Sequence, residues 1–287
     1  TPGTRFAGRL DAAMREFCGR LAASGGFSGV VYSGTDDPGE GEHKIMHEMR
    51  RASREGGAER GALLYGLDAD LILLSMVVRA QTGRCPCIVR EATAVGRDSE
   101  GGYVFLDVDS LIDTVLEDAP PGLSERDKIM NHVVSSFLVG NDFLPPLSCQ
   151  SIKDGCLERL GRRATDPLCG TAYDVDWDAL SRLVRGIADE EDEYFRKADA
   201  RYWCMRPPDT SDPVALWDAH PVVNKDDANR RIRPGSPGWR PRYYDALFHT
   251  RDVARVVADY LAGVQWTLDY YTGRHAGSTP EWMYPHA

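Results

Sequence analysis

The sequence predicts an α/β fold with a mainly parallel sheet, followed by a mostly helical extension. Two observations lead to this prediction. Up to about residue 150, short apolar runs typical of strands alternate with amphipathic segments typical of helices, which favours helices layered on a parallel sheet. Beyond residue 150, apolar residues recur at helical intervals between long polar stretches. Carboxylates follow several of the apolar runs, and strand ends are where parallel sheets bind ligands.

The elements of the first part can be assigned in order along the chain. A first helix is expected where apolar residues step at helical intervals, namely Phe6, Leu10, Met14, Phe17 and Leu21. The further elements expected are strands over residues 27–32, 62–67, 87–90 and 103–108, and helices over 42–53, 71–84 and 125–139. Ser124 is the predicted N-cap of the last of these helices, because its hydroxyl can accept a backbone hydrogen bond.

The second part predicts two long helices joined by an irregular connection. The first helix is marked by Trp177, Leu180, Val184, Ile187 and Tyr194. Residues 206–242 are dominated by proline, glycine and charge, so we expect no regular element there. The final helix is marked by Val253, Val256, Tyr260, Val264, Leu268 and Tyr271.

Two aspartates inside an apolar run are the most informative residues of the chain. Residues 63–78 read LLYGLDADLILLSMVV, and the only charges in this run are Asp68 and Asp70. Burying an unpaired carboxylate is costly, so cations or water must compensate both groups. In extended backbone the two side chains would point to the same side. A hard metal ion at a strand end explains them, and so does an ordinary junction with solvated acids.

Three further carboxylates occupy similar positions at the ends of apolar segments. Glu40 and Glu42 repeat the acid-x-acid spacing, and Asp142 follows another apolar segment. Five acids could therefore converge on one pocket, where they would repel each other unless cations lay between them. Ligands that are all oxygen favour Mg²⁺ or Mn²⁺ over zinc.

Several motifs resemble those of one nuclease family. PGEGEHKIM at residues 38–46, YGLDADLILLS at 65–75 and FLVGNDFLP at 137–145 are similar to the core motifs of the Xrn-type 5′→3′ exoribonucleases, within the PIN-like and flap-nuclease superfamily. Further resemblances follow in order along the chain: TPGT at 1–4, IKDG at 152–155, GWRPRYY at 238–244, GVQW at 263–266 and WMYPH at 282–286. The resemblance implies a PIN-like nuclease core with its helical extension.

The resemblance also implies an activity and a set of site residues. The activity is stepwise removal of nucleoside 5′-monophosphates from single-stranded RNA with a 5′-monophosphate, using two Mg²⁺ or Mn²⁺ ions. Family metal positions match Glu40, Glu42, Asp68, Asp70 and Asp142, and His43 and Asn141 would support these ligands. Trp282 matches a tryptophan that stacks on RNA bases, although a core or hinge tryptophan is the alternative.

A basic helix face lies beside the first acidic motif. Lys44, Arg50, Arg51 and Arg54 could follow phosphates, so Lys44 and Arg50 are candidate RNA-binding residues. A plain solvated face is the alternative interpretation.

Composition and charge limit which partners and which cellular location can be expected. The chain has 287 residues, a net charge of −10 and a pI near 5.2, which is unlike a typical nucleic-acid binder. Seven scattered cysteines without a disulfide framework suggest reduced thiols. We find no apolar run long enough for a membrane helix and expect no membrane partner. An intracellular location, cytoplasmic or nuclear, is expected.

The resemblance implies that a segment is missing. In the resembled family TPGT lies well inside the nuclease domain, after further acids and a pocket for the 5′-phosphate. We therefore expect residues 1–150 to be the C-terminal part of the nuclease domain, residues 151–287 its helical extension, and an N-terminal segment of the same protein as partner. The chain alone is then expected to be inactive. The alternatives are a non-catalytic RNA- or partner-binding derivative and a flap-type DNA nuclease.

The chain departs from the family pattern at four positions. Asn131 and His132 stand where the family usually carries paired acids, Pro146 replaces an expected histidine, and Met283 replaces an aromatic residue. The five acids are retained, so the departures leave the rate and the metal preference open.

Overall fold

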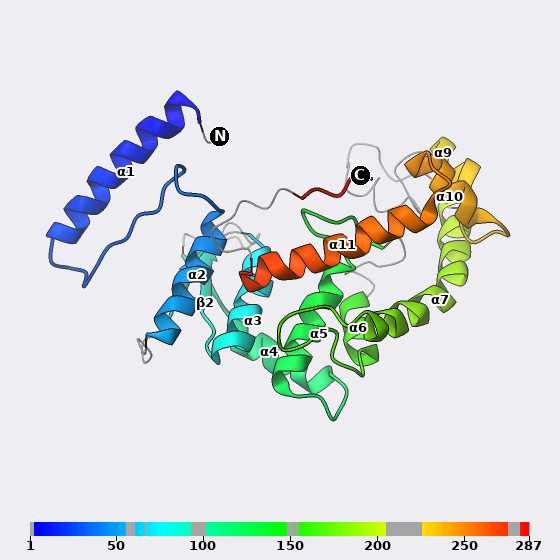
Figure 1. The fold of residues 1–287 in the computed structure, drawn as a ribbon, viewed down its shortest axis with the longest axis horizontal. Helices are drawn as coiled ribbons and strands as arrows, with labels where there is room; N and C mark the ends of the chain where they lie inside the picture. Colours follow the sequence, from blue (N-terminus) through cyan, green and yellow to red (C-terminus); the bar gives the residue numbers. More distant parts are fainter. Residues whose placement is uncertain are drawn as a thin grey trace. The chain divides into compact units, whose positions relative to one another are not determined.

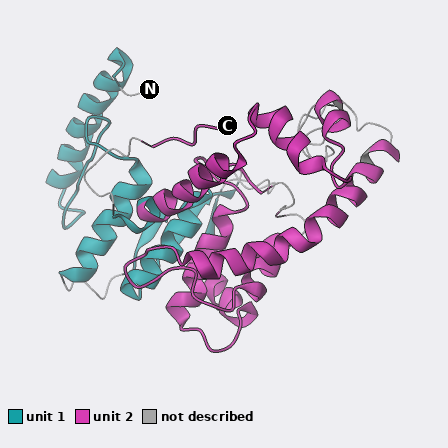
Figure 2. Cartoon of the chain, turned by 45° about the vertical axis from the view of Figure 1, so that its right-hand side comes forward, with its two compact units in different colours: residues 1–106, 270–281 teal, residues 107–269, 282–287 magenta. Residues whose placement is uncertain are grey.

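The computed structural model describes residues 3–55, 61–66, 68–92, 102–147, 152, 155–204, 226–274 and 282–286. The chain divides into two compact units, coloured separately in Figure 2. Unit 1 comprises residues 1–106 and 270–281, and unit 2 comprises residues 107–269 and 282–287. The motif residues Thr1, Pro2, Lys153 and Asp154 lie outside the described part of the chain.

Unit 1 is built on a three-stranded sheet in the order β1-β2-β3. Its elements are α1 (Arg5–Ala23), α2 (Gly41–Arg54), β1 (Leu63–Tyr65), α3 (Asp70–Thr82), β2 (Cys87–Glu91) and β3 (Tyr103–Asp107). Strands β1 and β2 run parallel, with Leu64 opposite Ile88. The parallel pair and the alternating helices confirm the predicted α/β class.

The core of unit 1 lies around α3, which packs against α2 (Figure 1). Most of α3 is buried, including Leu74, Met76 and Val77, because this helix is apolar around nearly its whole circumference. Met46 of α2 and Ile88 of β2 are also buried. The acidic segments of unit 1 therefore adjoin this apolar core.

Helix α1 is predicted correctly, but its apolar stripe is exposed. Phe6, Leu10 and Phe17 are 67%, 49% and 45% exposed. Asp11 of α1 accepts a hydrogen bond from Arg15 Nε within the helix at 2.7 Å and one from the Tyr32 hydroxyl of the following segment at 3.0 Å.

The strand predicted over residues 27–32 is wrong. These residues form no ladder, and Val31 is 86% exposed. A β-rich composition makes a strand only where a neighbouring strand accepts its backbone hydrogen bonds. The segment is held instead through the Tyr32 side chain on α1.

Unit 2 is helical, in agreement with the predicted extension. Its elements are α4 (Val108–Asp118), α5 (Glu125–Phe137), α6 (Cys156–Arg163), α7 (Trp177–Cys204), α9 (Asp226–Ile232), α10 (Trp239–Phe248) and α11 (Val253–Thr272), whose last turn belongs to unit 1. Helix α5 is the buried centre and packs against α4 and α6. Ser124 caps α5 as predicted, since its Oγ accepts from Asp127 N at 3.1 Å.

Two other predictions for this part need comment. The irregular connection over residues 206–242 is wrong at its end, because α9 and part of α10 fall there; residues 206–225 lie outside the described chain. Trp239 of α10 donates from Nε1 to Asp192 Oδ1 at 2.7 Å, so packing on α7 favours helix there. The predicted division at residue 150 stays a prediction, while the compact units follow a different division.

No helix in the described part of the chain is long and apolar enough to cross a membrane.

Candidate functional site

The loop ahead of α2 places two of the predicted metal ligands at the start of that helix. Asp37 accepts hydrogen bonds from Ser33 Oγ and Gly34 N, both at 3.0 Å, and Lys44 Nζ donates to Gly34 O at 2.9 Å. These contacts close the loop on itself. Glu40 is the N-cap residue and Glu42 lies in the first turn, where the helix dipole stabilises carboxylates.

Tyr270 joins this acidic segment to the end of α11. Its hydroxyl donates to Glu40 Oε2 at 2.8 Å. Burial raises the pKa of Tyr270 above its usual range, and the hydrogen bond to Glu40 and the charges of Glu40, Glu42 and Asp70 raise it further. Three predicted ligands therefore act on one phenol within unit 1. Tyr270 was missed in the sequence, where the only signal was a tyrosine pair at the end of a helical pattern.

His43 lies between α2 and the same end of α11. Its ring centroid is 3.7 Å from that of Tyr270, and Tyr271 meets it edge-on at 6.2 Å. Burial, and then the charge of Arg50, lower the pKa of His43 to about 4, so its imidazole is neutral at pH 7. The supporting role of His43 at the metal site stays a prediction.

Asp68 and Asp70 lie at the carboxyl end of β1, but not in extended backbone as predicted. Asp70 is the first residue of α3, and Asp68 Oδ1 accepts a hydrogen bond from Asp70 N at 3.2 Å. The acid-x-acid spacing thus starts a helix, because the side chain of Asp68 satisfies one of its unpaired N–H groups. The Asp68 carbonyl accepts from Arg90 of β2 at 3.3 Å.

Substitutions at Asp68 should separate its capping from its charge. Asp68→Ala removes the acceptor for Asp70 N and is expected to lower the free energy of unfolding by about 1 kcal/mol. Asp68→Asn keeps an acceptor oxygen and should leave stability nearly unchanged. Urea unfolding followed by circular dichroism measures both. Equal stability of the two variants would contradict the capping role.

In unit 2, Asn141 shapes the loop that carries Asp142. Asn141 Oδ1 accepts from Phe143 N and Leu144 N at 2.9 Å, and its backbone N donates to Leu144 O at 3.0 Å. Gly140 has φ +99°, a conformation that favours glycine, and a Cβ there would lie 3.0 Å from Pro146 N. Asp142 is exposed on this turn. Asn141 therefore holds the turn that carries Asp142, and its support of a metal ligand stays a prediction.

The donor chemistry of the five acids fits a hard cation, since every group is a carboxylate. Glu40, Glu42, Asp68 and Asp70 belong to unit 1, and Asp142 belongs to unit 2. Among the residues that the structure describes, no group of three or more acid, histidine or cysteine side chains is arranged to hold a metal ion. Their convergence on two ions therefore stays a prediction.

The two basic RNA-binding candidates make contacts within unit 1. Lys44 donates to the loop carbonyl of Gly34. Arg50 donates to Gln81 Oε1 at 2.5 Å and to Tyr271 O at 2.8 Å. These contacts favour a structural role on the helix face, and RNA binding by either residue stays a prediction.

Trp282 packs within unit 2 against aromatic and glycine neighbours. Its ring is stacked on Trp266, with centroids 5.3 Å apart and planes 28° apart, and Phe143 meets Trp266 edge-on at 4.8 Å. A Cβ on Gly263 would lie 2.3 Å from Trp282 Cη2. Trp282 remains half-buried, so the base-stacking role and the hinge role both stay predictions.

Gly263→Ala should displace Trp282. The added methyl cannot fit at 2.3 Å, so we expect altered tryptophan fluorescence and a loss of about 1–3 kcal/mol in unfolding free energy. Gly186→Ala on α7 is the matched control, because a Cβ there meets nothing within 4 Å. That change should stabilise slightly through helix propensity. Similar effects of both substitutions would contradict the close packing of Trp282.

Comparison with known proteins identifies the family. Residues 1–92 match the family described as XRN 5′-3′ exonuclease N-terminus, and residues 209–287 match the Xrn1 helical domain. The chain thus belongs to the Xrn family of 5′-3′ exonucleases, with two successive domains matched in order.

Several curated relatives are named 5′-3′ exoribonuclease 2. A 5′-3′ exoribonuclease 2 of Cryptococcus neoformans is 28% identical over 247 residues, covering 69% of this chain and 22% of the relative. The proteins of that name from Yarrowia lipolytica and Arabidopsis thaliana are 34% and 30% identical, covering 56% and 69% of this chain and 17% and 24% of the relatives. The chain therefore spans about a quarter or less of their length.

Proposed function

We propose that the protein to which this chain belongs is a 5′→3′ exoribonuclease acting on single-stranded RNA with a 5′-monophosphate. The observation that carries the proposal is the retention of acids in all three core motifs of a chain of the Xrn family: Glu40, Glu42, Asp68, Asp70 and Asp142. The products would be nucleoside 5′-monophosphates, as the family resemblance implies.

The proposed chemistry assigns a task to each group of residues. The five carboxylates would hold two Mg²⁺ or Mn²⁺ ions, which supply a nucleophilic water and stabilise the leaving oxygen when bound. Tyr270 positions the Glu40 carboxylate through its hydrogen bond, and Asn141 fixes the turn that presents Asp142. Trp282 would stack on a base without discriminating sequence.

One observation supports oxygen-ligated magnesium over zinc in this proposal: all five predicted ligands are carboxylates, whose oxygens hard cations prefer.

Two alternatives give different results in the same assays. A binding-only derivative would retain RNA without releasing mononucleotides. A flap-type DNA nuclease would cleave branched DNA faster than RNA, although the helical-domain match to Xrn1 favours the exoribonuclease.

The proposal is tested by following the products from 5′-monophosphorylated and 5′-hydroxyl RNA. With Mg²⁺, the whole protein is expected to release nucleoside 5′-monophosphates from the phosphorylated RNA, and EDTA should abolish the release. The 287-residue chain by itself is expected to release none, because the family resemblance implies that further acids complete the metal site of the whole protein. Release from whole protein in EDTA, or cleavage of flap DNA in preference to RNA, would overturn the proposal.

A further inference from the structure

The last turn of α11 belongs to unit 1, where side chains of α2 and α3 bind its backbone. The final carbonyls of a helix have no partner within it, and buried carbonyls need donors from elsewhere. Arg50 Nη2 donates to Tyr271 O at 2.8 Å, and Gln81 Nε2 donates to Thr272 O at 3.0 Å. Because Tyr271 and Thr272 are both buried, these two donors fix the end of α11 on unit 1.

Arg50 and Gln81 also bind each other, and we call this pair the clamp. Arg50 Nε donates to Gln81 Oε1 at 2.5 Å, so the clamp links α2 to α3 as well as to α11. Gly273 follows α11 with φ +79°, and a Cβ there would lie 3.0 Å from Arg50 Nη1. A guanidinium is favourable at this position, because the C-terminal end of a helix carries partial negative charge.

Tyr270 lies directly before the two residues whose carbonyls the clamp holds. Its hydroxyl donates to Glu40 Oε2 at 2.8 Å, and its ring centroid is 3.7 Å from that of His43. Side chains leave a helix in directions set by its backbone, so holding the carbonyls of Tyr271 and Thr272 also sets the direction of the Tyr270 side chain. The clamp therefore determines where the phenol meets Glu40.

We propose that Arg50 and Gln81 are positioning residues of the metal site, because they hold the turn from which Tyr270 orients the Glu40 carboxylate. The inference rests on the proposed function, in which Glu40 is a metal ligand. Groups that hydrogen-bond to a metal ligand fix its orientation, and their loss typically weakens metal binding about tenfold to a hundredfold. Arg50 thereby has a task at the site other than contact with RNA.

The test measures the affinity of the whole protein for Mn²⁺ alone, by calorimetry without RNA. Arg50→Ala and Tyr270→Phe are each expected to weaken Mn²⁺ binding about tenfold or more. Tyr270→Phe keeps the ring beside His43 and removes only the hydroxyl that binds Glu40. Since both substitutions act on the same carboxylate, the double variant should show little further loss, whereas independent effects would multiply.

Gln81→Leu is a second and milder variant of the clamp. It removes the contacts with Arg50 and Thr272 and should weaken Mn²⁺ binding about threefold or more. Circular dichroism checks that every variant is folded. At saturating Mn²⁺, the KM for 5′-monophosphorylated RNA should stay unchanged in the clamp variants, because the clamp acts on a metal ligand and not on the RNA.

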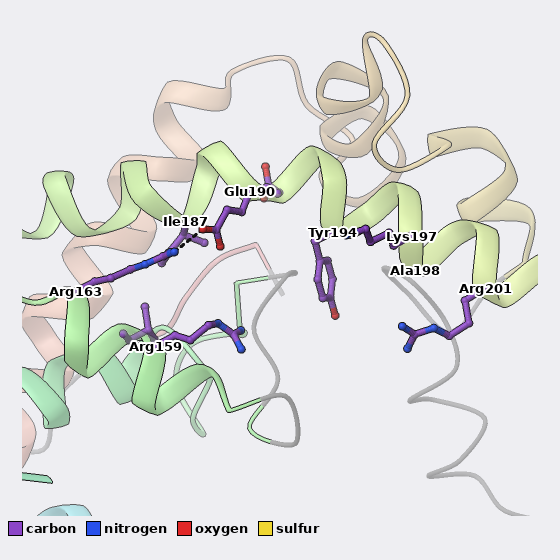
Figure 3. A pocket seen from close by; sticks show the side chains of 10 residues that line it. Arg159, Arg163, Ile187, Glu190, Tyr194, Lys197, Ala198 and Arg201 are labelled. Atoms are coloured by element: carbon purple, nitrogen blue, oxygen red, sulfur yellow. Dashed lines mark hydrogen bonds and ion pairs between the residues drawn. The ribbon is translucent and has the colours of Figure 1, made fainter. Parts of the chain in front are cut away.

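Arg163→Ala is the matched control, because Arg163 of α6 also binds a backbone carbonyl and a side chain of another element. It donates to Gly186 O of α7 at 3.2 Å and pairs with Glu190, as Figure 3 shows for the side-chain pair. Neither α6 nor α7 carries a predicted metal ligand. The control should therefore bind Mn²⁺ as tightly as the unmodified protein.

Unchanged Mn²⁺ binding by folded Arg50→Ala or Gln81→Leu would overturn the positioning role, and a raised KM for RNA would then assign Arg50 to the substrate. Multiplying effects of Arg50→Ala and Tyr270→Phe, or an equal loss in Arg163→Ala, would also overturn it, since they indicate general destabilisation. Absence of Mn²⁺ binding by the unmodified protein would overturn the proposed metal site, and this inference with it.

Discussion

Replacing Asp70 by asparagine is expected to reduce RNA hydrolysis by the whole protein by about a hundredfold to a thousandfold. The carboxylate stands at the start of α3, beside the apolar core of unit 1, and it acts electrostatically on Tyr270 together with Glu40 and Glu42. A neutral amide cannot offset the charge of a metal ion, and losing a ligand of this kind costs several kcal/mol of transition-state stabilisation.

The experiment compares single-turnover rates on 5′-monophosphorylated RNA at saturating Mg²⁺. Asp113→Asn on α4 is the control, since Asp113 is exposed and lies outside the acidic motifs. It removes the same charge from the chain and should leave the rate unchanged. A rate for Asp70→Asn within a few fold of the unmodified protein would remove Asp70 from the proposed metal ligands.

Asn131→Asp is expected to lower the free energy of unfolding by about 3–5 kcal/mol, although it restores an acid of the family pattern. Asn131 is 3% exposed on α5. Its Nδ2 donates to Ala164 O at 3.1 Å and to Asp166 O at 2.9 Å, and its Oδ1 accepts from Leu168 N at 2.7 Å. A carboxylate would lose both donors and face two carbonyl oxygens.

The pH dependence of this variant's unfolding free energy separates the effect of the introduced charge from the effect of the lost hydrogen-bond donors. Burial would raise the pKa of the introduced carboxyl in the folded state above its value in the unfolded chain. The variant therefore loses stability as pH rises through the folded-state pKa, and its deficit relative to the unmodified protein should narrow as pH falls. Denaturant unfolding at pH 4.5 and pH 8 measures this. A deficit that is small, or equal at both values, would contradict the structural role of Asn131.

Features of the fold that depend on nearby residues were predicted from the sequence, whereas features that depend on distant residues were not. Helices α5, α7 and α11 were predicted because periodicity and the Ser124 cap are local signals. Residues 27–32 were predicted as a strand and are not one, because a ladder also needs a partner strand. The extended arrangement of Asp68 and Asp70 was not found, because Asp70 is already the first residue of α3 and donates its backbone N–H to Asp68 Oδ1.

The candidate site shows the same limit. Apolar context and resemblance singled out five candidate acids, but Tyr270 is separated from Glu40 by 230 positions, and nothing near it in the sequence links it to that acid. The departure at Asn131 likewise had no explanation in the sequence, because its three partners lie 33 to 37 residues further on. Contacts between remote segments appear only in the folded chain.

The end of α11 has a consequence for the order of folding during synthesis. Arg50 of α2 donates to Tyr271 O, Gln81 of α3 donates to Thr272 O at 3.0 Å, and Tyr270 donates to Glu40. The ribosome delivers these three partners about 190 to 230 residues after the groups they satisfy. These contacts can therefore form only after residues 270–272 have been synthesised. Until then, a ribosome-bound intermediate would expose this part of the α2 and α3 surface to chaperones.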